Sequence, residues 1–278
     1  MKYITPFSNL KNSTGKHKDW YSVEFIQIFC QQLNPNDKHF SSKQFCQAYK
    51  KEYKKLELKG RMTLIANLLD QFLDQHTYPQ QLKILTALLG PKLPFEEGMF
   101  TLCFFLYPVS QFVELFGVNN LKPSLAFIEK LTMRFTGEWA IRPFAQQYQD
   151  EVLAQMKKWS THNNFHVRRL ASEGLRARLP WGKQITWVNE SPEKTLIIYN
   201  KLRNDGVLYV RRSVANSMGD MIKIDEDLAL STFDKWLKMK KTADNLWVIK
   251  HAIRTPVKKK NKTFLNLKEK VQKEMLKL

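Results

Sequence analysis

Three side chains of this sequence have the chemistry and the setting to act on a cation: Asp220, Glu138 and Trp181. Asp220 lies eight residues after Arg212 with Asn216 between them, so the spacing places all three on one face of a predicted helix. Near the C-terminus of that helix a carboxylate meets the negative end of the helix dipole, which costs about 0.3–1 kcal/mol. A carboxylate kept there in basic surroundings is a candidate catalytic group. The alternative is an ion pair with a neighbouring arginine.

Glu138 and Trp181 carry weaker local signals. Thr136 can cap a helix, and a glutamate in the first turn of that helix is favourable for structural reasons alone. Trp181 follows Pro180 at an expected repeat corner, where an indole can stack on a sugar or on a cationic base. Most tryptophans are core residues, and we expect one of Trp181 and Trp187 to be one.

The positive charge is concentrated in the second half of the chain. The 278 residues carry a net charge of +19, of which residues 1–139 contribute +5 and residues 140–278 contribute +14. Without low-complexity tracts, such an excess indicates a polyanionic partner, most often DNA or RNA. A merely soluble basic surface, or attraction to anionic lipid, is the alternative.

Apolar residues recur at helical spacing, which predicts an all-α protein. We expect helices over 23–33, over 62–73 after Gly60, and over 82–88 before Gly90. The 10 glycines and 11 prolines are too few for the many tight turns of a β fold. No apolar run is long enough to span a membrane, and the start has no secretory signal pattern.

Three segments of the second half resemble one another. Their anchoring valines, Val167, Val210 and Val248, are 43 and 38 residues apart, close to the period of HEAT repeats. Each begins a predicted second helix, and the first helices lie around 145–159, 193–202 and 227–238. Stacked helical pairs of this kind form a curved superhelix, an α-solenoid. The turn before each second helix contains a capping or turn-forming residue: Asn163, Asp205 and Asp244.

The repeats also place basic residues in register. The residue two positions after each valine is Arg169, Arg212 or Lys250, whereas the valine and the residue four positions on face the core. We expect the three to form a row that tracks DNA phosphates, a solvated helix face being the alternative. Glu173 is expected to pair with Arg169 or Arg176 within its helix. The further phosphate contacts predicted here are Arg142, Arg168, Arg211 and Arg254.

Four blocks resemble the AlkC-type DNA alkylation-repair glycosylases of the AlkC/AlkD superfamily. They are FTGEWAIRPF (135–144), VRRLASEGLRARLPW (167–181), VRRSVANSMGD (210–220) and, near the N-terminus, LELKGR (56–61). The resemblance spans about residues 20–255. Gly137, Ala177 and the segment 217–219 depart from the family pattern. Some members carry a C-terminal immunoglobulin-like domain, for which 278 residues leave no room, so we expect the form without it.

The resemblance implies hydrolysis of the N-glycosidic bond of 3-methyladenine and 3-methylcytosine in DNA, without flipping the base into a pocket. It implies Asp220, Glu138 and Trp181 as catalytic residues. A base of this kind is already a cationic leaving group, so the enzyme chiefly has to stabilise the sugar cation and place a water molecule. The expected partner is double-stranded DNA containing alkylated bases. We also expect a cytoplasmic, nucleoid-associated monomer that needs no membrane.

The expected domains are an N-terminal helical segment (1–60), a repeat domain for DNA binding and catalysis (61–262), and a basic tail or short helix (263–278). No cofactor or metal is expected, because Cys30, Cys46 and Cys103 lack metal-ligand spacing and suit buried thiols. Two alternatives stay open. A non-catalytic repeat protein that binds distorted or branched DNA needs the basic row without the carboxylates. A protein-binding solenoid would use the row against an acidic partner.

Overall fold

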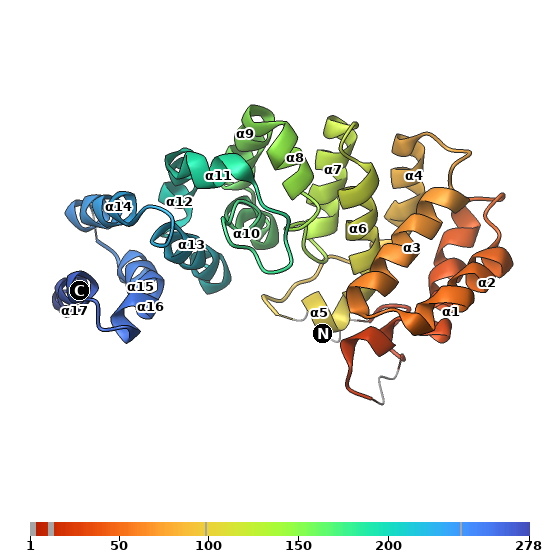
Figure 1. Cartoon of the computed structure of the whole chain (residues 1–278), viewed down its shortest axis with the longest axis horizontal. Helices are drawn as coiled ribbons and strands as arrows, with labels where there is room; N and C mark the ends of the chain where they lie inside the picture. Colours follow the sequence, from red (N-terminus) through yellow and green to blue (C-terminus); the bar gives the residue numbers. More distant parts are fainter. Residues whose placement is uncertain (1–3, 11–13, 98, 240) are drawn as a thin grey trace. The chain divides into compact units, whose positions relative to one another are not determined.

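The computed structural model describes residues 4–10, 14–97, 99–239 and 241–278, and these residues form helices with no strand among them (Figure 1). The all-α prediction is confirmed. The chain divides into two compact units, Met1–Ile141 and Arg142–Leu278. The boundary expected at residue 60 instead falls inside helix α3 (Leu58–Phe72). Gly60 does not interrupt that helix, because its missing side chain makes room for Leu56, whose Cβ would lie 3.2 Å from an added Cβ.

Unit 1 is a set of packed helices that begin at local sequence signals. Ser22 caps α1 by accepting a hydrogen bond from the backbone of Phe25 (3.2 Å). Thr77 and Gln80 form a capping box at the start of α4. Besides α3, the α-helices of the described part of unit 1 are α1 (Val23–Leu33), α2 (Ser42–Glu52), α4 (Tyr78–Leu85), α5 (Met99–Leu102), α6 (Tyr107–Phe116) and α7 (Leu121–Thr132).

The core of unit 1 follows from the apolar stripe of α3 and from a cluster of aromatic rings. Met62, Ile65 and Leu69 are fully buried, and α3 packs along α6. Phe7 stacks on Phe105, with ring centroids 4.4 Å apart. The contact between α3 and α6 buries the apolar face that the sequence pattern predicted for α3.

Unit 2 consists of paired helices in the order that the internal repeat predicts. The first helices are α9 (Gln149–Trp159), α12 (Leu196–Leu202) and α14 (Glu226–Lys238), and the second helices are α10 (Phe165–Glu173), α13 (Leu208–Met221) and α15 (Ala243–Ala252). The remaining α-helices of its described residues are α8 (Arg142–Gln147), α11 (Thr186–Glu190), α16 (Arg254–Lys258) and α17 (Lys262–Met275).

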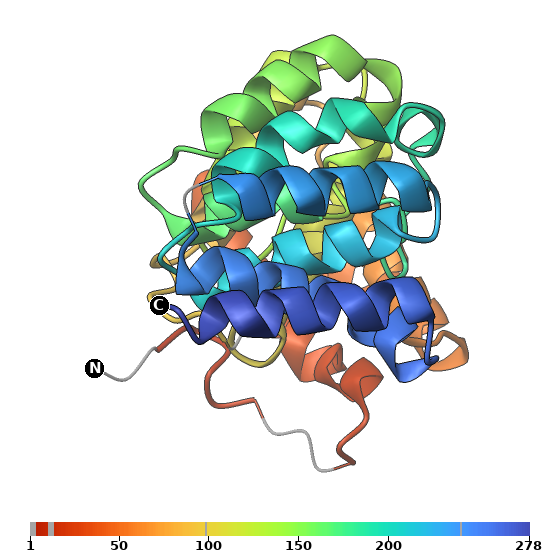
Figure 2. The same ribbon diagram turned by 90° about the vertical axis from the view of Figure 1, so that its left-hand side faces the viewer.

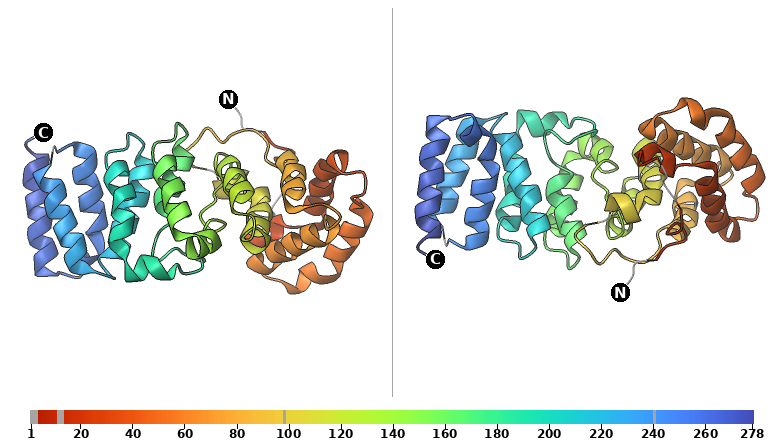
Figure 3. Two further views of the ribbon diagram at one scale, coloured as in Figure 1. Left: turned by 90° about the horizontal axis from the view of Figure 1, so that it is seen from above. Right: turned by 90° about the horizontal axis from the view of Figure 1, so that it is seen from below.

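The HEAT-like stacking of unit 2 is confirmed. Helix α10 packs on α13, and α13 packs on α15, so the second helices stand side by side (Figure 3). Val167, Val210 and Val248 are completely buried, as are the residues four positions later. The spacing of the valines in the sequence therefore matches the spacing of the buried positions from one repeat to the next.

Ion pairs join each repeat to the next. Arg168 on α10 binds both carboxylate oxygens of Asp205 in the turn before α13 (2.6 and 3.1 Å). One repeat later, Arg211 on α13 lies 3.0 Å from a carboxylate oxygen of Asp244 on α15. Asp205 and Asp244 thus join neighbouring repeats, and Asp205 also forms the expected turn, because its Oδ1 accepts from the backbone N–H of Val207 at 2.9 Å. The helix caps are different residues, Asn164 for α10 and Thr242 for α15.

The basic C-terminal segment ends in a packed helix. Helix α17 begins at Lys262, where Asn261 caps it, and buries Phe264, Leu267 and Val271. It packs against α15 and crosses the front of unit 2 in Figure 2. The segment predicted from residue 263 is therefore the last helix of this unit.

Candidate functional site

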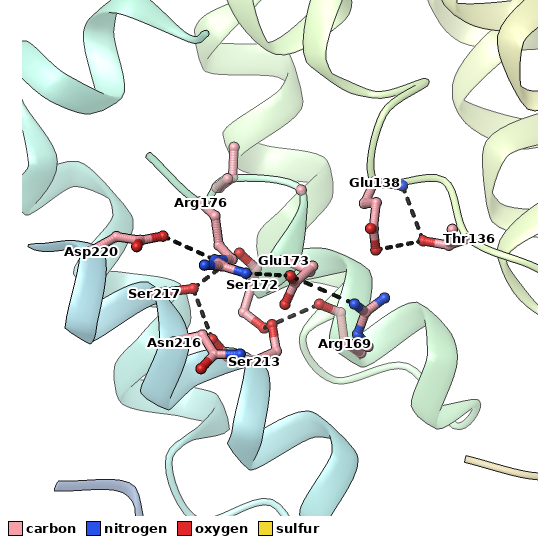
Figure 4. Close-up of polar contacts among 12 residues, drawn as sticks. Thr136, Glu138, Arg169, Ser172, Glu173, Arg176, Ser213, Asn216, Ser217 and Asp220 are labelled. Atoms are coloured by element: carbon pink, nitrogen blue, oxygen red, sulfur yellow. Dashed lines mark hydrogen bonds and ion pairs between the residues drawn. The ribbon is translucent and has the colours of Figure 1, made fainter. Parts of the chain in front are cut away.

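Asp220 is a buried carboxylate in the last turn of α13, as the sequence predicted. Its Oδ2 accepts a hydrogen bond from Nε of Arg176 at 2.9 Å (Figure 4), and Nζ of Lys223 lies 4.0 Å from its Oδ1. These two cations offset the unfavourable helix end. Asp220 therefore forms the ion pair with an arginine that was the structural alternative to a catalytic role. The expected neighbour on the same helix face, Arg212, is exposed to solvent.

Arg176 joins Asp220 to a second buried carboxylate. Its NH1 group donates to Oε1 of Glu173 at 2.8 Å, and NH2 of Arg169 lies 3.6 Å from the same oxygen. Burial raises the pKa of Glu173, but the two guanidinium groups outweigh burial and hold that pKa below its ordinary value. The result is an ion-pair network of alternating charge, in the order Arg169, Glu173, Arg176, Asp220 (Figure 4). The predicted pairing of Glu173 is confirmed with both arginines.

Hydroxyl groups hold α10 and α13 together beside this ion-pair network. The Oγ atoms of Ser172 and Ser213 are 2.7 Å apart, and Oγ of Ser217 on α13 donates to the backbone carbonyl of Ser172 on α10 at 3.4 Å. A Cβ added to Gly219 would lie 3.3 Å from the carbonyl oxygen of Ala252, so α13 approaches α15 closely there. Ser217 and Gly219 thus lie where α13 packs closely against α10 and α15.

Arg142 is a structural residue of unit 2. Its side chain is only 1% exposed, and NH1 donates to the backbone carbonyls of Gly174 (3.0 Å) and Arg176 (2.9 Å). Its Nε donates to the carbonyl of Lys183. These bonds fasten both ends of the loop between α10 and α11. The prediction that Arg142 contacts phosphate is not supported, because burial leaves its guanidinium no surface to offer.

Trp181 stands at the tip of that loop. It is 64% exposed, and its φ of 62° lies in the left-handed region. The backbone N–H of Gly182 donates to the carbonyl of Leu179 (3.1 Å), so the turn places Pro180 and Trp181 at its centre. Such a turn favours glycine at the second central position. A bulky residue held there costs about 1–3 kcal/mol, and strain of this kind concentrates at functional sites.

Of the tryptophan pair considered from the sequence, Trp187 is the core member. It is buried, and its Nε1 donates to the carbonyl of Ala145 at 2.7 Å. A side chain at position 182 would clash with the Arg142 side chain, 3.0 Å away. Gly182 therefore leaves room for the Arg142 side chain next to the turn that contains Trp181.

Glu138 belongs to unit 1 and is buried there. The hydroxyl of Thr136 donates to its Oε2 (2.9 Å), and the same hydroxyl accepts from the Glu138 backbone N–H (3.2 Å). The helix expected to start at Thr136 is absent. Residues 138–141 form a turn, and α8 begins at Arg142. Glu138 therefore does not lie in the first turn of a helix, and the structural explanation expected from the sequence does not apply to it.

The predicted phosphate contacts differ in how much surface they present. Arg212, Lys250 and Arg254 are exposed, although NH2 of Arg254 also donates to Oδ1 of Asn216 at 2.9 Å. Arg169 is largely covered, with its guanidinium 4.8 Å from the centre of the Tyr209 ring. Arg168 and Arg211 are engaged in the inter-repeat ion pairs.

The residue that sequence reasoning passed over is Arg176. It was considered only as a partner of Glu173, yet it also binds Asp220, 44 positions further along the chain. Its place just beyond the end of α10, three residues after a glutamate, was the available signal. Among the residues that the structure describes, no group of side chains is suited to hold a metal ion, and no helix is long and apolar enough to cross a membrane.

Comparison with known proteins places these features in a wider context. No protein-family model matches the chain. YhaZ, an uncharacterised protein of Bacillus subtilis (strain 168), is 36% identical over 251 residues, which are 90% of this chain and 67% of that protein. Among solved structures, the Pseudomonas fluorescens alkylpurine DNA glycosylase AlkC, bound to DNA containing an abasic site analog, is 32% identical. That match has a TM-score of 0.79 and covers 92% of this chain and 68% of AlkC.

Proposed function

This chain belongs to the AlkC-type family of DNA glycosylases, and from that membership we propose that it excises cationic N-alkylated bases from double-stranded DNA. The proposed substrates are 3-methyladenine and 3-methylcytosine, each hydrolysed at its N-glycosidic bond without base flipping. The observation that carries the proposal is the buried, arginine-bound carboxylate of Asp220, connected through Arg176 to the loop that presents Trp181.

Asp220 is the proposed catalytic carboxylate. As the bond between the sugar carbon and the base nitrogen breaks, the base leaves with the bonding electrons and becomes neutral. Positive charge then develops on the sugar. A fixed carboxylate stabilises that charge and orients the water whose oxygen bonds to the sugar carbon and which gives up a proton. Arg176 holds one carboxylate oxygen of Asp220, which fixes the orientation of the group.

Trp181 is proposed to offer its indole face to the same cation. An exposed indole gains about 0.5–1 kcal/mol from a cation over its ring, and more when water is excluded. Arg142 is proposed as the positioning residue of this loop, because its three carbonyl bonds hold the backbone on both sides of the turn. Glu138 remains a second proposed carboxylate on the evidence of its burial and its bond to Thr136.

DNA binding is proposed to rest on the basic residues of unit 2. Arg212, Lys250 and Arg254 are the leading phosphate contacts because they are exposed. Arg168, Arg169 and Arg211 are proposed as weaker contacts, since protein groups already occupy much of each guanidinium. We further propose a monomer that acts on chromosomal DNA in the cytoplasm, with no cofactor.

The experiment is to incubate the full chain with methylated duplex DNA and to measure free 3-methyladenine and 3-methylcytosine by chromatography. Release of either base above the spontaneous rate supports the proposal. If neither base is released although the protein binds the duplex, the alternative applies. The protein is then a non-catalytic repeat protein that binds distorted or branched DNA. The observation that favours this alternative is the exposure of Arg212, Lys250 and Arg254, which can bind DNA without any catalytic carboxylate.

A further inference from the structure

Arg203, at the end of α12, is a buried cation without a carboxylate. The residue is 5% exposed, and among the described residues its Nε and NH1 atoms have no hydrogen-bond partner. Burial lowers the pKa of this guanidinium. Buried charges are normally paired, because an unpaired one loses its hydration without compensation. Arg142, the other buried arginine among the described residues of this unit, donates to backbone carbonyls.

The contacts that Arg203 does make leave the edge of its guanidinium poorly satisfied. Its plane lies against the Trp236 ring, with 5.4 Å from Cζ to the ring centre. Its NH2 group donates to Sδ of Met239 at 3.4 Å. A thioether is a weak acceptor, so it occupies a place where an oxyanion would bind much better. Met239 is 56% exposed and unbranched, and it can swing away from this edge.

A cavity of about 250 Å³ adjoins this edge, between α12 and α14. The described side chains that line it include Arg203 and the exposed Lys235, but no carboxylate. Leu196, Trp236 and Met239 supply an apolar wall. Oδ1 of Asn200 accepts from Nε1 of Trp236 at 2.6 Å, which leaves its amide NH2 group as a further donor. The volume suits a ligand smaller than an ordinary drug molecule.

We propose that this cavity is a binding site for a small organic anion, whose carboxylate or phosphate group replaces the Met239 thioether on the guanidinium of Arg203. Lys235 adds a second positive charge at the mouth, and the apolar wall takes the body of the ligand. The site lies on the first helices of the repeats. It is separate from Asp220 and Trp181, and it does not depend on the proposed glycosylase activity.

The test uses the full chain labelled with ¹⁵N and observes the side-chain Nε–Hε resonances of its arginines. The Arg203 resonance is assigned as the one missing in Arg203→Met. Sodium benzoate and inorganic phosphate are titrated separately, with sodium chloride keeping the ionic strength constant. We expect a saturable shift of the Arg203 resonance with at least one anion. Benzoate alone identifies a carboxylate ligand, and phosphate alone a phosphate ester. No saturable shift with either anion overturns the proposal.

Thermal melting gives a second readout. At about ten times Kd the effective anion should raise the Tm of the wild type by about 2–3 °C, and it should leave the Tm of Arg203→Met unchanged. Without ligand, Arg203→Met should be at least as stable as the wild type, because it removes an unpaired buried charge. A ligand-induced rise in Tm that persists in this variant contradicts the proposal.

Lys235→Glu tests the site without touching the core. Reversing this exposed charge should weaken anion binding about fivefold, whereas Lys201→Glu, which reverses the charge of an exposed lysine of α12 outside the cavity lining, should have no effect. Equal losses in the two variants would mean that general surface charge attracts the anion. If Arg203→Met weakens duplex DNA binding as much as Arg212→Ala does, Arg203 contacts DNA and the small-ligand site is refuted.

Discussion

The substitution Asp220→Asn tests the proposed mechanism most directly, because it removes one charge and almost no volume. If the carboxylate lies about 4 Å from the sugar cation at an effective dielectric constant of about 20, their interaction is about 4 kcal/mol. The asparagine keeps part of this as a dipole. We expect the excision rate to fall by about 10²–10³, the range typical for removing one such electrostatic group. Duplex affinity should stay constant or rise slightly, since a negative charge is lost.

Asp220→Asn also weakens the ion pair with Arg176, so stability needs its own control. The amide oxygen can still accept from Nε, and Glu173 still binds the same guanidinium at 2.8 Å. The loss should be about 1 kcal/mol, the difference between a charged and a neutral hydrogen bond. Asp205→Asn is the matched variant: the Asp205 side chain is 7% exposed, against 6% for Asp220, and an arginine binds both.

The assay is single-turnover release of 3-methyladenine, with duplex binding by fluorescence anisotropy and Tm measured on the same samples. Asp205→Asn should lower Tm to a similar degree and leave the excision rate within about twofold of the wild type. The reasoning is refuted if Asp220→Asn excises at the wild-type rate. It is equally refuted if Asp205→Asn is as slow, because the loss then follows from the broken ion pair.

The other predictions concern the second carboxylate, the loop, the basic row and the half-buried His251. Glu138→Gln should slow single-turnover excision less than Asp220→Asn does, since an amide oxygen still accepts from Thr136; an equal loss would show that the two carboxylates contribute equally. Arg142→Met should lower the excision rate with duplex affinity unchanged, because the loop carrying Trp181 loses three bonds, and faster tryptic cleavage after Arg176 or Arg178 would report the loosened loop. Arg212→Ala should flatten the log–log salt dependence of DNA binding by about one unit, and an unchanged slope contradicts the phosphate contact. Burial and the charges of Arg254 and Arg212 lower the pKa of His251 from 6.5 to about 4. The unfolded chain therefore takes up this proton first as pH falls, and stability decreases from pH 6.5 to pH 4; His251→Gln should flatten the Tm profile over that window.

The repeat architecture was predictable because it is periodic. The buried valines and the residues four positions later recur every 38–43 residues. Helices α10 and α13 begin two residues before their valines, whereas α15 begins at Ala243, five residues before Val248. Cys30 and Cys103 are buried as expected, whereas Cys46 is only partly covered. Of the tryptophan pair, Trp187 lies in the core and Trp181 is exposed. The unit boundary after Ile141 was not predicted, because no run of proline, glycine or charge marks it.

Sequence alone could not separate the arginines by role. Arg142, Arg168 and Arg212 look alike in a basic segment, yet the first binds carbonyls, the second binds Asp205 and the third faces solvent. Which role each one takes depends on partners some 30–40 positions away. The link from Arg176 to Asp220 was missed for the same reason, since 44 residues separate the two.

The turn at Trp181 has a consequence for how this protein would respond to selection. Glycine at position 181 would adopt the left-handed backbone without strain, and it would also remove a large apolar side chain from the solvent. A library screened only for heat resistance should therefore become enriched in Trp181→Gly. A library screened for survival under alkylating agents should retain the indole. Selection for stability and selection for DNA repair should thus favour different residues at position 181.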